Sequence, residues 1–172
     1  MTAARLVYEN ELHFHVREVQ DPDYLSWTVD ETLTFAYGYL TPEARVRLNL
    51  RRPDESVSES NVRSAVLETK VFLGTDGNSR VKTMCDLEVA QAVAVYGLSE
   101  RTLTKTLRTY RMAKGTWQLS FRPATFDLMA AEFVFDSSTD VDPPESPNFV
   151  IAPFTLTGEN EFYTYGQATP RS

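Results

Sequence analysis

The sequence predicts a mainly β protein of the α+β class: a closed antiparallel barrel of eight strands with one or two short helices. Three observations lead to this prediction. About eight segments have strand composition and are mostly joined by short turns. Two of them, residues 5–17 and 44–51, alternate between polar and apolar side chains, which is the period-two pattern of a strand. Closing such a set of strands into a barrel removes the exposed edges that an open sheet would leave.

Composition supports one globular domain and limits its partners. The 172 residues are 42% apolar and 24% charged, which suits a single domain over residues 1–172. The net charge of −7 excludes a generally basic surface, so no duplex DNA partner is expected. No apolar run approaches the roughly 20 residues that cross a bilayer. The single cysteine, Cys85, cannot form an internal disulfide, so we expect a soluble cytoplasmic protein without membrane contact.

The first predicted strand, residues 5–17, has two unlike faces. Its polar face carries Arg5, Glu9, Glu11, His13, His15 and Arg17. In most antiparallel sheets such a face meets water. The alternative is that it lines a water-filled barrel, where carboxylates and imidazoles could meet a ligand. His13 and His15 also have a spacing found in zinc sites on strands, although no third or fourth ligand is evident in the sequence.

Residues 21–61 are predicted to contain a helical turn, two strands and a loop. Asp21-Pro22 begins a segment that could form one or two helical turns. Residues 31–40 are rich in Thr, Phe and Tyr, which favour a strand. The strand at 44–51 places Arg45, Arg47, Asn49 and Arg51 on one face. The polar stretch at 52–61 is expected to be a mobile loop, because its composition cannot form a core.

The rest of the chain alternates strands and turns, apart from one helix. Residues 62–73 and 79–89 flank Asp76-Gly77, a hairpin signal. Residues 87–96 lose the alternation and are rich in Ala, so a short helix is expected there. Three further strands are predicted, at 99–112, 116–122 and 127–136. An acidic, Pro-rich connection at 137–147 should be exposed, and the aromatic tail after it should pack on the barrel.

If both alternating strands turn their polar faces inward, opposite charges share the barrel interior. Glu9, Glu11 and His13 would then face Arg45 and Arg47. Arginine guanidinium groups match phosphate oxygens in paired hydrogen bonds. Neighbouring carboxylates hold a divalent cation that screens the same phosphates. A polyphosphate with its metal therefore fits this interior.

Several motifs along the chain resemble those of the CYTH superfamily, the triphosphate tunnel metalloenzymes. Glu9-Asn10-Glu11-Leu12-His13 is similar to the family's Glu-x-Glu-x-Lys. Further resemblances follow in the family's order: Tyr37-Gly38-Tyr39-Leu40 with Arg45-Val46-Arg47, Glu68-Thr69-Lys70, Lys105-Thr106-Leu107-Arg108, Trp117 to Phe121, Ala131-Glu132-Phe133-Val134 and the closing segment 153–168. The resemblance implies a tunnel-shaped barrel that binds triphosphates with Mg²⁺ or Mn²⁺.

The chain departs from the family at acidic positions. Lys82 and Met84 stand where the family has a middle-strand Glu-x-Glu, Ser120 replaces an aspartate, and Val134 replaces a late glutamate. The metal ligands and catalytic groups that the resemblance still implies are Glu9, Glu11 and Glu132. With so few carboxylates, Mg²⁺ or Mn²⁺ binding would be weak without phosphate oxygens from the substrate.

The basic half of the implied site is better preserved. Its phosphate-binding residues would be His13, Arg45, Arg47, Lys70, Lys82, Lys105 and Arg108. Lys105 and Arg108 have opposite parity in one strand, so only one of them can face the interior, and the sequence leaves open which.

These features lead to a functional hypothesis with two alternatives. The protein is predicted to bind a triphosphate-bearing ligand, which could be a nucleotide, an RNA 5′-triphosphate or an inorganic polyphosphate. If it is an enzyme, it would be a metal-dependent triphosphate phosphohydrolase with slow turnover. The alternative is a catalytically inactive interaction or structural module. A barrel for a small apolar ligand is a further alternative, against which the number of arginines argues.

Overall fold

The computed structural model describes residues 4–73, 79–136, 145–154 and 167–171. Within these ranges β-strands predominate, and the described elements include one α-helix and one short 3-10 helix. In chain order the elements are β1 (Arg5–Val16), η1 (Asp23–Ser26), β2 (Glu31–Tyr39), β3 (Ala44–Leu50), β4 (Val62–Leu73), β5 (Ser79–Leu87), α1 (Val89–Gly97), β6 (Arg101–Met112), β7 (Gly115–Phe121), β8 (Leu128–Phe135), β9 (Val150–Phe154) and β10 (Thr169–Pro170).

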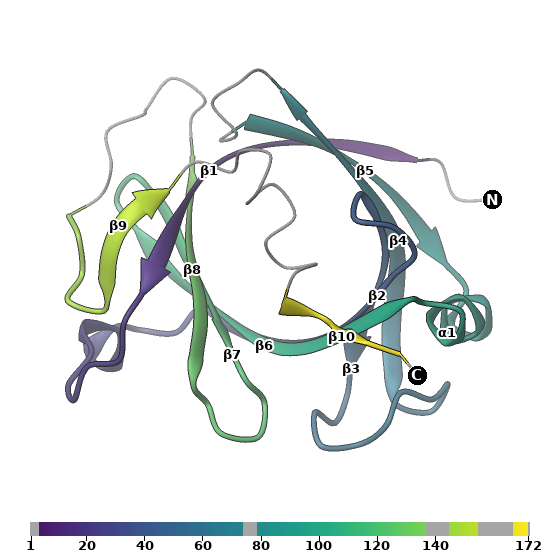
Figure 1. Cartoon of the computed structure of the whole chain (residues 1–172). Coiled ribbons are helices and arrows are strands. Elements are labelled where there is room, and N and C mark those ends of the chain that lie inside the picture. Colours follow the sequence, from purple (N-terminus) through teal and green to yellow (C-terminus); the bar gives the residue numbers. More distant parts are fainter. Residues whose placement is uncertain (1–3, 74–78, 137–144, 155–166, 172) are drawn as a thin grey trace.

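The strands form one strongly curved antiparallel sheet that surrounds a common interior (Figure 1). The strand order is β10-β6-β2-β3-β4-β5-β1-β8-β7, β9 pairs with β1, and β6 also pairs with β7. The runs β2 to β5 and β6 to β8 pair in sequence order, because short connections can join antiparallel strands, whereas β1, β9 and β10 pair with strands distant in the chain. We call the side of the sheet that faces this interior, away from α1, the inner face.

The prediction of a closed eight-stranded barrel is wrong. The sheet has ten described strands, since β9 and β10 add to it. It is also interrupted at β1: residues 5–10 of β1 pair with β5, whereas residues 11–14 pair with β8. No described residue of β1 therefore links both neighbours. His13 and Phe14 pair with β8 and also with the short strand β9, and Val16 pairs with β9. Strand β9 comes from the aromatic tail and carries no clear alternation.

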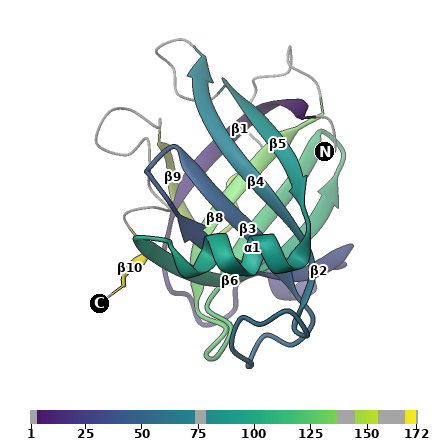
Figure 2. The ribbon, with the colours of Figure 1, turned by 90° about the vertical axis from the view of Figure 1, so that its right-hand side faces the viewer.

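Apolar side chains of the outer face bury α1 against the sheet. The helix lies across the strands on the outside (Figure 2) and contacts β2, β3 and β4. Its packing is close at Gly38, where an added Cβ would lie 2.9 Å from the ring of Tyr96 in α1 and 2.1 Å from the Oγ of Ser99, which follows the helix. The buried residues of this cluster are Ala36, Val46, Leu48, Leu50, Val62, Ala65 and Ala92. Because Val46, Leu48 and Leu50 point outward to the helix, Arg45 and Arg47 point to the inner face.

A second outer cluster forms around Trp117. Tyr24 and Trp27, from the segment around η1, pack against Phe14, Trp117 and Phe149 together with other buried aromatic residues. The apolar side chains of β1, such as Leu12 and Phe14, belong to this outer cluster. Because side chains alternate along a strand, Glu11 and His13 point to the inner face. Packing on the outside of the sheet therefore fixes which charged side chains face the interior.

The structure bears out the predicted helix and most strands, and leaves other segments untested. The helix expected at 87–96 is α1, and a single 3-10 turn stands where one or two helical turns were expected. In the loop at 52–61, Asn61 is fully buried and its side-chain amide donates to the carbonyls of Arg52, Glu55 and Ser56; the mobility of this loop stays a prediction. The hairpin turn at 74–78 and most of the acidic connection, 137–144, lie outside the described residues. None of the described helices is long and apolar enough to span a membrane.

Candidate functional site

Arg45 and Arg47 share the buried carboxylate of Glu68. Antiparallel pairing sets Arg45 directly opposite Glu68 on β4, so their side chains share one face. Arg45 Nε donates to Glu68 Oε2 at 2.8 Å, and Arg47 Nη1 lies 2.9 Å from Oε1 in an ion pair. The Glu68 side chain is 0% exposed. One carboxylate thus holds two guanidinium groups on the inner face.

Aromatic rings from β2 line the same cluster. Tyr39 and Tyr37 pair with Arg45 and Arg47 in the register of β2 and β3. The guanidinium of Arg45 lies 4.4 Å from the centre of the Tyr37 ring, within range of a cation–π interaction. Arg45 Nη1 also donates to the Tyr39 hydroxyl at 3.3 Å. These contacts limit how far the Arg45 side chain can move.

The charges of this cluster stabilise one another against burial. Burial alone would raise the pKa of Glu68, but Arg45 and Arg47, helped by Lys82 and Lys70, outweigh it and lower the pKa from 4.5 to about 2. Burial alone would lower the pKa of Arg45, but Glu68 outweighs it, so that pKa is raised. Both groups are therefore ionised in the folded protein at neutral pH.

We expect acid to remove the stabilisation that ionised Glu68 supplies. Because its pKa is lower in the folded than in the unfolded chain, this contribution is complete above about pH 4.5 and is lost as the pH falls to about 2. The lost free energy of unfolding is about 3 kcal/mol. Urea unfolding at stepped pH should show the stability difference between the wild type and Glu68→Gln shrinking through this window. A difference that stays constant with pH would contradict the assignment.

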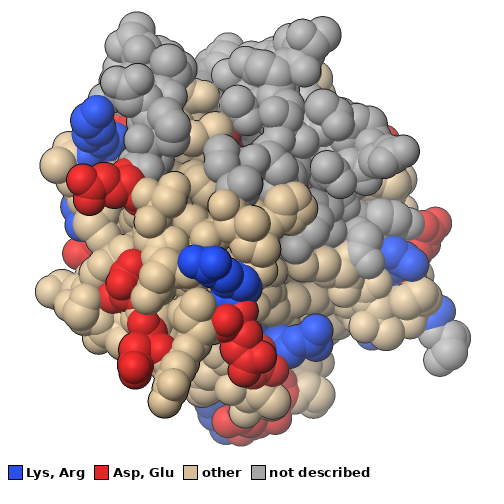
Figure 3. Space-filling model, turned by 60° about the vertical axis from the view of Figure 1, so that its left-hand side comes forward, with Lys and Arg blue, Asp and Glu red and all other residues tan. Residues whose placement is uncertain are grey.

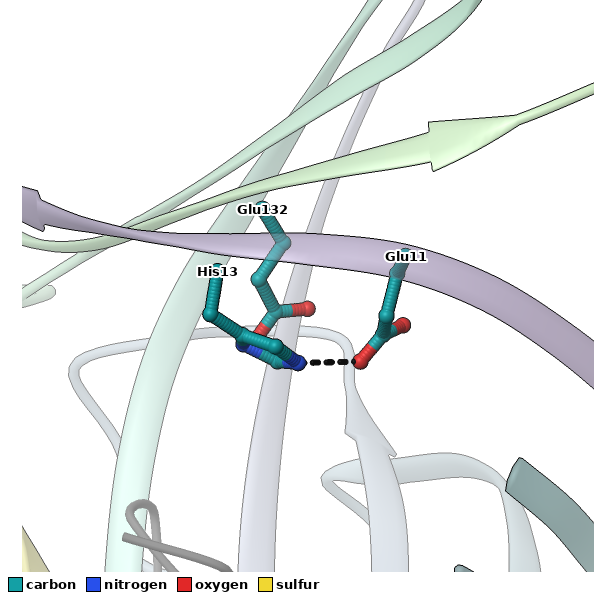
Figure 4. A group of neighbouring side chains, drawn as sticks. All are labelled: Glu11, His13 and Glu132. Atoms are coloured by element: carbon teal, nitrogen blue, oxygen red, sulfur yellow. Dashed lines mark ion pairs between the residues drawn. The ribbon is translucent and has the colours of Figure 1, made fainter. Parts of the chain in front are cut away.

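A second cluster joins Glu11 and His13 of β1 to Glu132 of β8. His13 and Glu132 are paired directly in the sheet, and Figure 4 shows the three side chains converging on one side of it. His13 Nε2 lies 2.7 Å from Glu11 Oε1, and His13 Nδ1 lies 3.6 Å from Glu132 Oε1. All three residues are buried. Two carboxylates therefore flank one imidazole.

The donor set of this cluster fits a divalent metal ion. One donor atom from each of Glu11, His13 and Glu132 lies within 4.8 Å of the others, and imidazole and carboxylate groups are common ligands of divalent metal ions in proteins. An imidazole among carboxylates suits Mn²⁺ or Zn²⁺ better than Mg²⁺, which prefers oxygen ligands.

Lys105 is buried on the inner face, and its Nζ lies 5.4 Å from the centre of the Tyr37 ring, which also contacts Arg45. Burial lowers the pKa of Lys105, whereas Glu132 and Glu11 oppose that effect and Arg45 reinforces it. These influences place the ammonium group in the fields of both the carboxylates and the guanidinium. Lys82 is also buried and Lys70 is partly buried, and the two pair across β4 and β5. Cations thus continue from the arginine cluster along the inner face.

Most of the predicted site residues come together, but not all. Arg45, Arg47, Lys70, Lys82 and Lys105 share the inner face with Glu11, His13 and Glu132. Arg108 instead contacts Phe121 and Phe126 on the outer face. The sequence left open whether Lys105 or Arg108 faces the interior, and in the structure it is Lys105. The side chain of Glu9 lies outside the described part of the structure, so its predicted role is untested. His15 is exposed.

Sequence reasoning missed three residues of the inner face. Glu68, Tyr37 and Tyr39 were part of the family resemblance but were not assigned to the site. The available signal was the spacing: Glu68 is two residues from Lys70, and Tyr37 is two residues from Tyr39, so each pair shares a face.

The outer surface on the β9 side differs from the inner face, because it carries basic and acidic side chains intermixed (Figure 3).

Comparison with known proteins identifies no family for this chain. No protein-family model matches it, and no curated protein matches it either. Among solved structures, the chain is similar to one described as "The crystal structure of the hypothetical protein NE1496". The two are 18% identical, the match covers 90% of this chain and 96% of that one, and the TM-score is 0.49.

Proposed function

We propose that the inner face binds a triphosphate-bearing ligand, either a nucleotide, an RNA 5′-triphosphate or an inorganic polyphosphate. The observation that carries this proposal is the position of Lys105, which is buried on the same face as both clusters, with its Nζ 5.4 Å from the centre of the Tyr37 ring that also contacts Arg45. A basic cluster and a potential metal-ligand cluster are thereby joined on one side of the sheet. Both clusters suit a phosphate chain, because cationic side chains bind its oxygens and a divalent metal ion, if bound, would screen its remaining charge.

The arginines retain donors for phosphate while they bind Glu68. Each guanidinium has five N–H donors, and Glu68 contacts one nitrogen of each. We expect Glu68 to position Arg45 and Arg47 so that their remaining donors meet phosphate oxygens, with Lys70, Lys82 and Lys105 adding charge. Glu68 is in this view a positioning residue, which does not touch the ligand itself.

Glu11, His13 and Glu132 would hold a divalent cation, with Mn²⁺ favoured over Mg²⁺ by the imidazole. A bound cation would screen phosphate charge and polarise a phosphoryl oxygen. The side chains themselves would orient the phosphate chain, and a carboxylate not engaged with the cation could accept a proton from water. Slow hydrolysis of a triphosphate is therefore part of the proposal, as is the relationship to the CYTH superfamily. A cytoplasmic location and the absence of a duplex DNA partner also remain predictions.

One observation favours the alternative of an inert interaction or structural module. Glu68 neutralises part of the charge of Arg45 and Arg47 through two short contacts, as a purely structural ion-pair network would. Under this alternative, triphosphates would not bind the inner face at all. Thermal stability in the presence of ligand separates the two functions, because a ligand bound only by the folded state must raise the melting temperature.

We expect tripolyphosphate to raise the melting temperature of the protein, and to raise it more with Mn²⁺ present. His13→Gln should abolish the Mn²⁺-dependent part, because His13 is a buried member of the ligand cluster. His15→Gln is the matched control, since His15 is exposed on the same strand and should behave as wild type. Release of inorganic phosphate, measured in the same samples, distinguishes an enzyme from a binder. An unchanged melting temperature with every triphosphate would establish the inert module.

A further inference from the structure

A small pocket on the outer face surrounds Arg108, the predicted site residue that the inner face does not use. Tyr24, Leu25, Arg108, Phe121 and Phe126 line a cavity of about 280 Å³. A neighbouring cavity of about 550 Å³ shares Tyr24, Leu25 and Phe126 with it. Small-molecule sites typically measure about 300–1,000 Å³, so the two together offer the room that a compact organic ligand needs.

Arg108 is held between aromatic rings. Its guanidinium lies 5.4 Å from the centre of the Phe121 ring and 5.2 Å from that of Phe126. It forms a side-chain hydrogen bond with Tyr110. Its Nε is buried and has no hydrogen-bond partner among the described residues. Buried donors are normally hydrogen-bonded, and a bound ligand could supply the acceptor for this one.

Phe126 has a backbone conformation that phenylalanine rarely adopts. Its φ is 57°, the one positive φ of a non-glycine residue in the described ranges, and bulky residues there are outliers. Two backbone hydrogen bonds hold the turn: Phe126 N donates to Arg122 O, and Arg122 N donates to Asp127 O, both at 2.9 Å. Phe126 is 52% exposed, and Leu25, which lines the same cavity, is 67% exposed. Strained backbone conformations of this kind persist where the surrounding contacts hold them in place, and they are often found at ligand-binding sites.

The chemistry of the pocket identifies the class of its ligand. Arg108 is the one charged residue among those that line the smaller cavity in the described part of the chain, and a guanidinium binds a carboxylate through parallel hydrogen bonds. The other walls of the smaller cavity are aromatic or aliphatic and would accommodate a flat ring. Because Glu18 and Asp127 line the neighbouring cavity, a ligand carboxylate is expected in the smaller one. We propose that this outer pocket binds a small aromatic carboxylate, with the carboxylate on Arg108 and the ring beside Phe126 and Tyr24. The exposed side chains of Leu25 and Phe126 would move aside to let an oxygen reach Nε.

Benzoate is a suitable probe, and NMR can follow the site directly. We expect millimolar benzoate to shift the Nε–Hε resonance of Arg108 and the amides of Tyr24, Leu25, Phe121 and Phe126. Benzamide, which has the same shape without the charge, should bind about tenfold more weakly or worse. Tripolyphosphate should not compete, because it is proposed to bind the opposite face. This independence separates failure of the present proposal from failure of the inner-face function.

Two variants and a control complete the test. Arg108→Lys keeps the charge but loses the paired donors, so benzoate affinity should fall about tenfold. Arg111→Lys, on the same strand but exposed and paired with Asp136, should bind as wild type. Phe126→Gly should weaken binding while the protein stays folded, since glycine tolerates a positive φ. Shifts that are absent or spread over the surface, equal binding of benzamide, or equal effects of the two arginine changes would each overturn the proposal.

Discussion

Glu68→Ala is expected to destabilise the protein by about 3–5 kcal/mol, because it leaves two guanidinium groups close together without their shared counter-ion. Arg45 is almost fully buried and cannot recover hydration by a small movement. The two arginines would also repel each other once the carboxylate between them is gone. Urea unfolding at neutral pH measures the change as a shift of the midpoint.

Glu55→Ala is the matched control for this prediction. Glu55 also forms a short ion pair with an arginine, Arg52, at 2.8 Å, but both side chains are about half exposed. Exposed pairs contribute about 0–1 kcal/mol, so this variant should remain close to wild type. If Glu68→Ala cost no more than Glu55→Ala, the inner-face ion pairs would not be the structural element that their geometry indicates.

Lys105→Met should lower the affinity for tripolyphosphate by about ten- to a hundredfold, the effect of losing a charge-assisted hydrogen bond. The substitution should preserve the fold, because methionine has a similar length and burial already disfavours the charged form of Lys105. Isothermal titration with Mn²⁺ present measures the affinity, and the melting temperature without ligand reports on the fold.

Lys114→Met is the control for Lys105. Lys114 is exposed in the turn between β6 and β7, so its loss changes the net charge equally without altering the inner face. Equal losses of affinity in both variants would show that tripolyphosphate responds to overall charge only. A loss confined to Lys105→Met would support a phosphate site between the two clusters.

The sequence was sufficient to predict which side chains of β1 and β3 share one face of the sheet. Alternation correctly placed Glu11 and His13 on one face of β1, and Arg45 and Arg47 on one face of β3, and the turn signals marked most strand ends. The sheet arrangement was predicted wrongly because its extra strands are short. β9 and β10 are held by pairing with β1 and β6, and their own sequences carry no alternation that would identify them.

The orientation of Arg108 shows the limit of local reasoning. Lys105 and Arg108 are three residues apart, so parity separates them but cannot say which one faces inward. Phe121 and Tyr24 decide the matter, since they pack on the outer face and Arg108 lies with them. The contacts that orient Arg108 come from residues far away in the chain.

By itself, the sequence determined which side chains share a face of each strand, because backbone geometry alternates side chains regardless of context. Only the tertiary structure decided which of the two faces is inner, because that depends on where α1 and the aromatic segment around η1 bury their apolar surfaces. It also decided that Glu68, which alternation alone did not distinguish, is the carboxylate on which Arg45 and Arg47 converge. Burial of apolar area, contributed by segments distant in sequence, is the physical reason for both outcomes.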